Sequence, residues 1–328
     1  MNDREPGRLR SLDVCSGAGG LALGLERAGF DPVLLVDDRD VACETLRSNR
    51  PGWSVHEGDL LAFDPSEHTR TYDVDLLSAG LPRVKATATV NRKDSEAEVR
   101  LLQATIWLLH GVQPRALLIE NVPHLVRRAD YEPLRDYIAE ELAHLGYRHR
   151  WFVVNAADFG VPQIRLQGIL VAFKGDALDA FVEPSPTVKE HRTVGEALGR
   201  SMATRGWADA ERWARQADEP ARTIVGGSWD RGGGDLGPRG TKTAWERMGV
   251  YGGSIADAVP DRSFVWDPGL GREGLVRLTT EQTAILQGFP EDWAFAGRKT
   301  ARYRQIGHAS PPPVGQALGA AIAAALRA

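Results

Sequence analysis

The chain has 328 residues, a length that suits one large α/β domain with a smaller inserted or appended one. Its net charge of −4 excludes the overall basic surface of a nucleic-acid coat protein, but it is compatible with one local basic cleft. With only two cysteines, Cys15 and Cys43, a disulfide framework and a four-cysteine zinc site are also excluded, and we expect no metal site. No segment approaches the roughly 20 apolar residues that span a bilayer, and residues 1–10 lack a secretory signal, so we expect a cytoplasmic protein.

The first half of the chain alternates between strand and helix patterns. Strands are predicted at 10–14, 33–36, 54–55, 74–78 and 116–119, with helices at 21–28, 41–48 and 97–112. Further β runs lie at 151–155 and 168–173. Strands separated by helices predict a parallel, doubly wound sheet.

Residues 175 to about 275 differ in composition from the rest. They are rich in glycine and proline and poor in helix or strand periodicity, which predicts a smaller domain built from loops. Helical patterns return from Leu278, and residues 313–328 form an Ala-rich amphipathic pattern.

A glycine-rich turn follows the first predicted strand and opens the first helix. Its glycines, within Asp13–Gly20, allow a ligand to approach the backbone closely, next to the free N–H groups of a helix N-terminus. Asp37 ends the second strand, where a carboxylate can bind ribose hydroxyls, and Asp59 follows the third, where it can accept from an adenine amino group. An ordinary βα turn with acids at the surface is the alternative. Three such features on successive strands favour a nucleoside-type ligand, and the absence of a P-loop lysine pattern argues against phosphate transfer.

Several motifs together resemble the DNA cytosine-5 methyltransferase family, and they occur in the family's order over nearly the whole chain. They are Asp13-Val-Cys-Ser-Gly17-Ala-Gly19-Gly20, Glu120-Asn-Val122, Phe159-Gly-Val-Pro-Gln-Ile-Arg165, Arg277-Leu-Thr-Thr-Glu281 with Leu286-Gln-Gly-Phe-Pro290, and Tyr303-Arg-Gln305-Ile-Gly-His308 with Pro311-Pro-Pro-Val314.

The resemblance implies a Rossmann-like, doubly wound domain that binds S-adenosylmethionine, or its demethylated product S-adenosylhomocysteine. It also implies a smaller loop-rich target-recognition domain and a role on duplex DNA, commonly in restriction-modification. The corresponding division is 1–175 for the cofactor domain, 176–276 for the recognition domain and 277–328 for a segment that returns to the first. Asp13, Gly17, Gly19, Gly20, Asp37, Asp59, Gln305 and His308 are the implied cofactor-binding residues.

The family's reaction flips the target cytosine out of the duplex, because its C5 and C6 atoms are otherwise stacked. In this family a cysteine thiolate adds to C6 while a glutamate, here Glu120, stabilises the ring at N3. The nucleophile lies in a Gly-x-Pro-Cys loop, which here reads Gly80-Leu-Pro-Arg83. A guanidinium stays protonated and has no lone pair with which to attack carbon, so Arg83 cannot act as that nucleophile.

A second departure lies in the family's Gln-x-Arg-x-Arg motif. Arg165 is retained, but Gln167 replaces the arginine that holds the cytosine carbonyl. His308 stands where the last motif usually has asparagine. Cys15, Cys43 and Thr87 are poor substitutes for the nucleophile, since the cysteines are expected to be buried and Thr87 would need an adjacent base. Either Arg83 pairs with Glu120 in a reshaped pocket or it points to solvent.

Arginines and a lysine in the small domain are candidate DNA contacts. Arg231, Arg239 and Lys242 flank a glycine-rich run and can reach phosphates or guanine edges, although an ordinary solvated loop has the same composition. Duplex DNA is the expected partner, and the nucleoid the expected place of action.

Three hypotheses follow. The first is a cofactor- and DNA-binding member of the family that lacks ordinary Cys-dependent methylation and acts as a non-catalytic or partner subunit. The second is an active DNA methyltransferase with altered chemistry or with a nucleophile supplied by a second subunit. The third is an enzyme that uses S-adenosylmethionine on a small molecule, against which the recognition-domain features count.

Overall fold

The computed structural model describes residues 7–84, 92–227 and 233–328. Contacts divide the chain into two compact units. Unit 1 contains residues 1–154, 166–185 and 314–328, and unit 2 contains residues 155–165 and 186–313. In the described part of the chain, no helix has the length and apolar character needed to cross a membrane.

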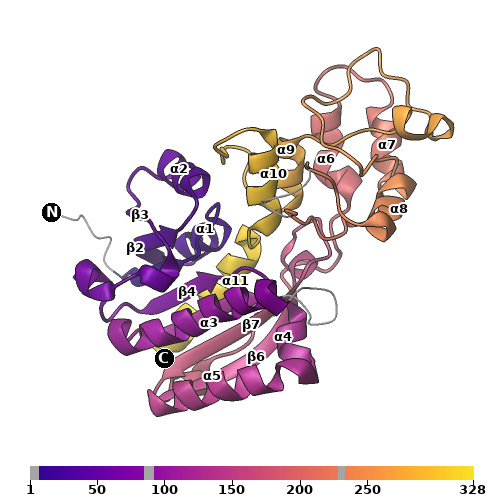
Figure 1. Ribbon diagram of the computed structural model, residues 1–328. Coiled ribbons are helices and arrows are strands. Elements are labelled where there is room, and N and C mark those ends of the chain that lie inside the picture. The colour runs from indigo at the N-terminus through magenta and orange to yellow at the C-terminus, as the bar shows by residue number, and fades with distance from the viewer. Residues whose placement is uncertain (1–6, 85–91, 228–232) are drawn as a thin grey trace. The chain divides into compact units, whose positions relative to one another are not determined.

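Unit 1 is built on a sheet of seven strands in the order β3-β2-β1-β4-β5-β7-β6 (Figure 1). The strands are β1 (Leu9–Val14), β2 (Phe30–Asp37), β3 (Val55–Glu57), β4 (Leu76–Gly80), β5 (Ala116–Asn121), β6 (Tyr147–Asn155) and β7 (Leu166–Lys174). The strands β1 to β5 pair in parallel, as the alternating pattern predicts. The later strand β7 departs from this direction, because it runs antiparallel to β5. A return from β6 to β7 without a crossover α-helix allows this direction.

Helices cover both faces of this sheet (Figure 1). They are α1 (Gly20–Arg27), α2 (Asp40–Asn49), α3 (Arg92–Val112), α4 (Pro123–Arg127), α5 (Glu132–His144) and α11 (Pro312–Arg327). Leu34 and Val36 of β2 join the core beneath α3, α4 and α5, whereas Leu35 packs with Ala22 of α1 and Leu46 of α2. Successive side chains of a strand point to opposite faces, so β2 is buried on both sides, which accounts for its continuous apolar run.

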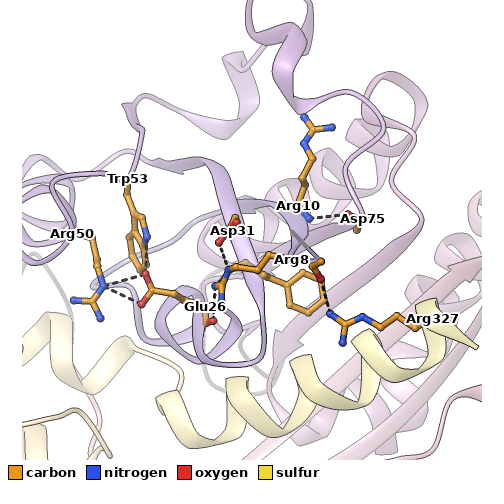
Figure 2. A network of polar contacts seen from close by, with 10 residues as sticks. Arg8, Arg10, Glu26, Asp31, Arg50, Trp53, Asp75 and Arg327 are labelled. Carbon is orange, nitrogen blue, oxygen red and sulfur yellow. Dashed lines mark hydrogen bonds and ion pairs between the residues drawn. The ribbon is translucent and has the colours of Figure 1, made fainter. Parts of the chain in front are cut away.

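A polar network fastens the first strand to its surroundings (Figure 2). Arg8 forms an ion pair with Asp31, and Glu26 of α1 accepts hydrogen bonds from Arg50 and Trp53 at 3.0 and 3.1 Å. These partners are more than 20 residues apart in the sequence, so the network joins the start of β1 to β2, and α1 to the residues after α2, through tertiary contacts.

Unit 2 has a core of its own, rich in tryptophan. Its α-helices are α6 (Val194–Met202), α7 (Ala210–Gln216), α8 (Arg239–Arg247), α9 (Thr280–Leu286) and α10 (Lys299–His308). Capping boxes start α6 at Thr193 and α9 at Thr279, each with its partner side chain three residues on. Residues 175–275 thus contain three short α-helices, α6, α7 and α8, which the composition did not predict.

The compact units do not follow the expected boundaries at 175 and 276. Leu278, Leu286 and Tyr303 pack in the same core as Trp213 and Trp245, so most of the segment after 276 clusters with unit 2. Only residues from Val314 onward return to unit 1, as part of α11. Composition marked the change at 175 but could not reveal which core the later helices join.

Candidate functional site

The glycine-rich turn after β1 is held in place by Asp37. Cys15, Gly17 and Gly19 all have positive φ, of 51°, 52° and 82°, and this left-handed backbone makes the sharp bend into α1. The Gly17 N–H donates to one carboxylate oxygen of Asp37 at 2.7 Å, and the Arg39 N–H donates to the other at 3.0 Å. Asp37 thus connects the turn to the end of β2.

Asp13 lies beneath the same turn. Its side chain is only 1% exposed and accepts a hydrogen bond from the Ser78 hydroxyl of β4. Burial raises the pKa of Asp13 to about 6, against the lowering effect of the Ser78 and Ser16 hydrogen bonds. Burial likewise raises the pKa of Asp37 to about 6, although the Gly17 and Arg39 N–H groups lower it. These two predicted cofactor residues therefore support the turn from inside.

Exposed carboxylates stand at the neighbouring strand ends. Asp59 is exposed, and one of its oxygens accepts from the Leu61 N–H at 2.9 Å at the start of a short 3₁₀ turn. Asp38, directly after Asp37, is also exposed, with 63% of its side chain accessible. Asp38 is not among the residues predicted from the sequence, although it is the second of two consecutive acids at the end of the strand. The turn is an acidic environment, because Asp37, Asp38, Asp13 and Asp59 all raise the pKa of Cys15 in addition to its burial.

A second cluster forms where β4 and β5 end side by side. The register pairs Gly80 of β4 with Glu120 of β5, so the loop after Gly80 starts beside Glu120. Asn121 holds this loop on both sides of Arg83: its amide donates to the Pro82 carbonyl at 3.3 Å, and its oxygen accepts from the Val84 N–H at 3.1 Å. The loop from Leu81 to Val84 is thus fixed by side-chain hydrogen bonds.

The antiparallel partner of β5 completes this cluster. Glu120 pairs with Ile169 of β7, which places Gln167 two residues away on the same face of the sheet, as a diagonal neighbour of Glu120. Both side chains are buried, at 5% and 1% exposure. On the other face, a Cβ at Gly168 would lie 2.4 Å from the Val122 carbonyl oxygen, so only glycine allows β7 to approach this closely.

Arg83 is half-buried at the centre of this loop. Burial lowers the pKa of its guanidinium, and the charge of Glu120 acts in the opposite direction and favours the cation. Across the residues that the structure describes, neither Arg83 nor Glu120 has an ion-pair partner. The sequence left two alternatives, an Arg83 paired with Glu120 and a solvent-facing Arg83; in the described residues no ion pair joins the two and Arg83 is half-buried, so neither alternative holds as stated.

Neither cysteine lies in an environment that favours its thiolate form. Burial, followed by the acids of the turn, raises the pKa of Cys15 well above its ordinary value. Burial raises the pKa of Cys43 to about 12, and its thiol donates to the Asp37 carbonyl from inside α2. Both remain protonated near neutral pH. Cys43 is buried, as predicted, whereas Cys15 is only partly buried. Thr87 lies outside the described residues.

In unit 2, the Arg165 side chain donates hydrogen bonds to backbone carbonyls. It is 1% exposed, and its guanidinium donates to the Ile224 and Gly307 carbonyls at 3.0 and 3.2 Å. The interpretation of Arg165 as a catalytic contact gains no support from these bonds, which join distant segments of unit 2. The neighbouring Gln163 accepts from the Ile224 N–H at 2.8 Å and donates to Gln287 at 2.7 Å, so the two residues act on one buried junction.

Two predicted cofactor residues lie in the same unit. Gln305 is 3% exposed and donates to the Ala296 carbonyl at 2.9 Å. One ring nitrogen of His308, which is exposed, lies 2.9 Å from the Gly227 carbonyl. Both contacts lie within unit 2. Contact of Gln305 and His308 with a cofactor stays a prediction.

The candidate DNA-contacting residues differ in exposure and in ion pairing. Arg239 is exposed at the start of α8. Lys242, one turn later, forms an ion pair with Asp235 at 3.0 Å. Arg231 lies outside the described residues. Arg239 is therefore the described member of this set that is most accessible to a phosphate.

Comparison with known proteins decides the lineage. The model of the C-5 cytosine-specific DNA methylase family matches residues 9–324. This chain belongs to that family. It is 41% identical to the Type II methyltransferase M.NaeI of Lentzea aerocolonigenes over 97% of this chain and 75% of the relative, and 38% identical to M.NgoMIV of Neisseria gonorrhoeae over 98% and 99%.

Solved structures of methyltransferases share the fold of this family member. That of Entamoeba histolytica EhMeth has a TM-score of 0.66 at 13% identity, covering 96% of this chain and 98% of its own. That of S. pombe Dnmt2 has a TM-score of 0.62 at 19% identity, covering 95% and 97%. The expected Rossmann-like methyltransferase fold is confirmed, and the family makes S-adenosylmethionine the implied methyl donor and DNA the implied substrate.

Proposed function

We propose that this protein binds S-adenosylmethionine and duplex DNA but does not carry out ordinary Cys-dependent C5 methylation. The observation that carries the proposal is Arg83, which stands at the position of the family's nucleophile in a loop whose backbone Asn121 holds on both sides of it. A guanidinium cannot add to C6, and neither Cys15 nor Cys43 offers a thiolate.

The acidic turn supports the choice of cofactor. Asp38 and Asp59 present exposed carboxylates beside a backbone turn, and Asp13 and Asp37 add negative charge from beneath. This environment disfavours phosphate-bearing cofactors and suits a ligand with sulfonium and ammonium charges. Asp38 and Asp59 would hold its ribose and adenine, and Asp37 would keep the turn in shape. When bound, this cofactor would supply an electrophilic methyl group.

Exposed basic residues and the family's substrate support DNA as the partner. We place phosphate contacts at Arg239 and at Lys242, and Arg231, which lies outside the described residues, stays a candidate from the sequence. The match to M.NgoMIV spans 99% of that relative in one chain, so we include no second subunit. The protein would act in the cytoplasm on cellular DNA.

An active methyltransferase is the competing function, favoured by the names of the relatives, which are Type II methyltransferases. A covalent trap separates the two. Duplexes containing 5-fluorocytosine form a gel-stable adduct only when a nucleophile adds to C6, so we expect none with the natural protein. Transfer of tritiated methyl groups to mixed-sequence duplexes is measured in parallel, and either signal above background would overturn the proposal.

Variants that restore the family residues serve as the positive control for the trapping assay. Arg83→Cys alone should restore little trapping, because Gln167 still replaces the arginine that holds the cytosine carbonyl. A charge-assisted hydrogen bond of this kind contributes about 1.5–3 kcal/mol, which corresponds to one to two powers of ten in rate. The double change Arg83→Cys with Gln167→Arg should therefore exceed either single change.

A further inference from the structure

The end of α10 carries a histidine at a position where the family usually has asparagine. His308 is the last residue of this helix, and its ring nitrogen Nε2 lies 2.9 Å from the Gly227 carbonyl oxygen. A carbonyl oxygen can only accept, so Nε2 carries a hydrogen and donates it. Because an asparagine side chain is shorter, its amide would stop short of the same oxygen. The departure from the family therefore adds a hydrogen bond to the Gly227 backbone.

The residue before Gly227 packs directly against the same helix end. A Cβ on Gly226 would lie 2.3 Å from the His308 ring and 2.6 Å from the Arg304 carbonyl oxygen. From the side of the helix, a Cβ on Gly307 would lie 2.3 Å from the Gly226 nitrogen. Glycine on both sides thus allows the two backbones to touch, and the His308 ring closes over this contact.

A different part of unit 2 holds the residues that precede this contact. The Ile164 N–H donates to the Ala221 carbonyl at 2.8 Å, and the Thr223 hydroxyl donates to the Ile164 carbonyl at 2.9 Å. The chain from 221 to 227, here called the anchored segment, is therefore bound first by the run around Ile164 and then by the end of α10. His308 is exposed, so its replacement would release the second end of the segment without removing the bonds at the first.

The anchored segment belongs to the region in which DNA contacts are expected. Its exposed Arg222 has an ion-pair partner in Glu219 at 3.8 Å, a long distance for a surface pair, so the guanidinium can turn to another acceptor. Beyond Gly227 the sequence continues to Arg231. Hydrogen bonds to base edges tolerate little displacement, so a segment that reads bases has to be held in place from behind.

We propose that His308 is a positioning residue for sequence discrimination on DNA. By holding Gly226 and Gly227, it fixes the anchored segment that presents Arg222. The proposal rests on the proposed function, from which it takes the DNA. The ring acts through the backbone of the segment, and the nitrogen that it uses for Gly227 is not available to a cofactor.

The test begins with a pool of duplexes whose central bases are randomised. The duplex that the natural protein selects is compared with a scrambled duplex of the same composition, and fluorescence anisotropy at fixed salt gives the ratio of the two affinities. His308→Ala should reduce this ratio about tenfold, the scale of one base contact. The salt dependence of binding should stay the same, because the phosphate contacts elsewhere are kept.

Rescue by a conservative variant distinguishes positioning from a general defect. The amide nitrogen of glutamine is as many bonds from Cα as Nε2 of histidine, so His308→Gln should restore most of the ratio. His144→Ala, in the last turn of α5 in unit 1, is the matched control and should leave the ratio unchanged. An unchanged ratio in His308→Ala, or no rescue by His308→Gln, would overturn the proposal.

A change on the opposite side of the contact tests whether the histidine acts through the segment. Gly226→Ala keeps the His308 ring but brings a methyl group against the Arg304 carbonyl, so it should displace the segment and lower the ratio as well. Urea unfolding of His308→Ala should remain close to that of the natural protein. A loss of discrimination that only follows a loss of stability would assign His308 a merely structural role and contradict the proposal.

Cofactor binding is the competing role of this side chain. Calorimetry with S-adenosylhomocysteine should give similar affinities for the natural protein and for His308→Ala. A weaker cofactor affinity with unchanged DNA discrimination would overturn the positioning role. A natural protein that binds all duplexes equally would also overturn it and leave the proposed function standing, whereas a protein that binds no duplex would refute the proposed function itself.

Discussion

The Asn121 side-chain oxygen accepts a hydrogen bond from the Val84 N–H at 3.1 Å. The same amide donates to Pro82, so the loop that carries Arg83 depends on one buried side chain of β5. Asn121→Ala should lower the free energy of unfolding by about 1–3 kcal/mol, because the Val84 N–H loses its partner. Urea denaturation measures this change, and limited proteolysis should then cut near residues 81–84. Asn49→Ala at the end of α2, which affects a bond to its own helix, is the control; an equal effect of both would contradict the role of Asn121.

Asp13 should make the protein less stable as the pH rises. Its pKa is about 6 when folded and about 3.8 ordinarily, so the folded state holds the proton more tightly. The contribution of Asp13 to the free energy of unfolding is therefore greatest below pH 3.8. It falls as the pH rises from 3.8 to about 6, and it stays constant at higher pH. The difference corresponds to about 3 kcal/mol.

Asp13→Asn removes this contribution and keeps an oxygen to accept from Ser78. We expect the variant to be more stable than the parent at pH 8 and to show a shallower decline between pH 4 and 6, with the remaining slope due to Asp37. Urea unfolding at closely spaced pH values measures both effects. Exposed Asp40→Asn serves for comparison, and an unchanged profile for Asp13→Asn would show that burial of Asp13 does not control the decline.

Arg165 should be a stability residue. Its replacement by methionine keeps the apolar stem but leaves the Ile224 and Gly307 carbonyls without its two N–H groups. We expect a loss of about 2–5 kcal/mol in urea unfolding, since buried acceptors lose charged partners. Exposed Arg247→Met should change stability little. A stable Arg165→Met protein with altered ligand binding would instead restore the catalytic interpretation.

Arg239 and Lys242 should contribute unequally to DNA binding. The ammonium of Lys242 is shared with Asp235 at 3.0 Å, whereas Arg239 is exposed at the start of α8. Arg239→Ala should weaken binding more than Lys242→Ala and reduce the salt dependence by about one phosphate contact. Asp235→Asn, which releases Lys242, should strengthen binding. A series of anisotropy titrations in KCl checks the order, and the reverse order would move the interface away from Arg239.

The motifs predicted the family and the strand–turn–helix start of unit 1 well, because they follow local rules. A strand, a left-handed turn at Gly17 and Gly19 and a helix are encoded within a few residues. The order of these motifs then implied the remainder by resemblance. The packing of the segment after 276 could not be predicted in this way, since the pattern of its helices suits either core equally well.

The sequence by itself determined the chemistry available at each position: a cation at Arg83, only two thiols, and an acid near the end of each of the first three strands. Tertiary structure decided what those groups do. Asp13 and Asp37 became supports beneath the turn because they are buried by strands that the sequence does not place side by side. Arg165 donates hydrogen bonds to two backbone carbonyls. The register of β4 with β5 brings the loop that carries Arg83 next to Glu120. Side-chain roles depend on partners that are distant in the sequence, and only folding determines which partners meet.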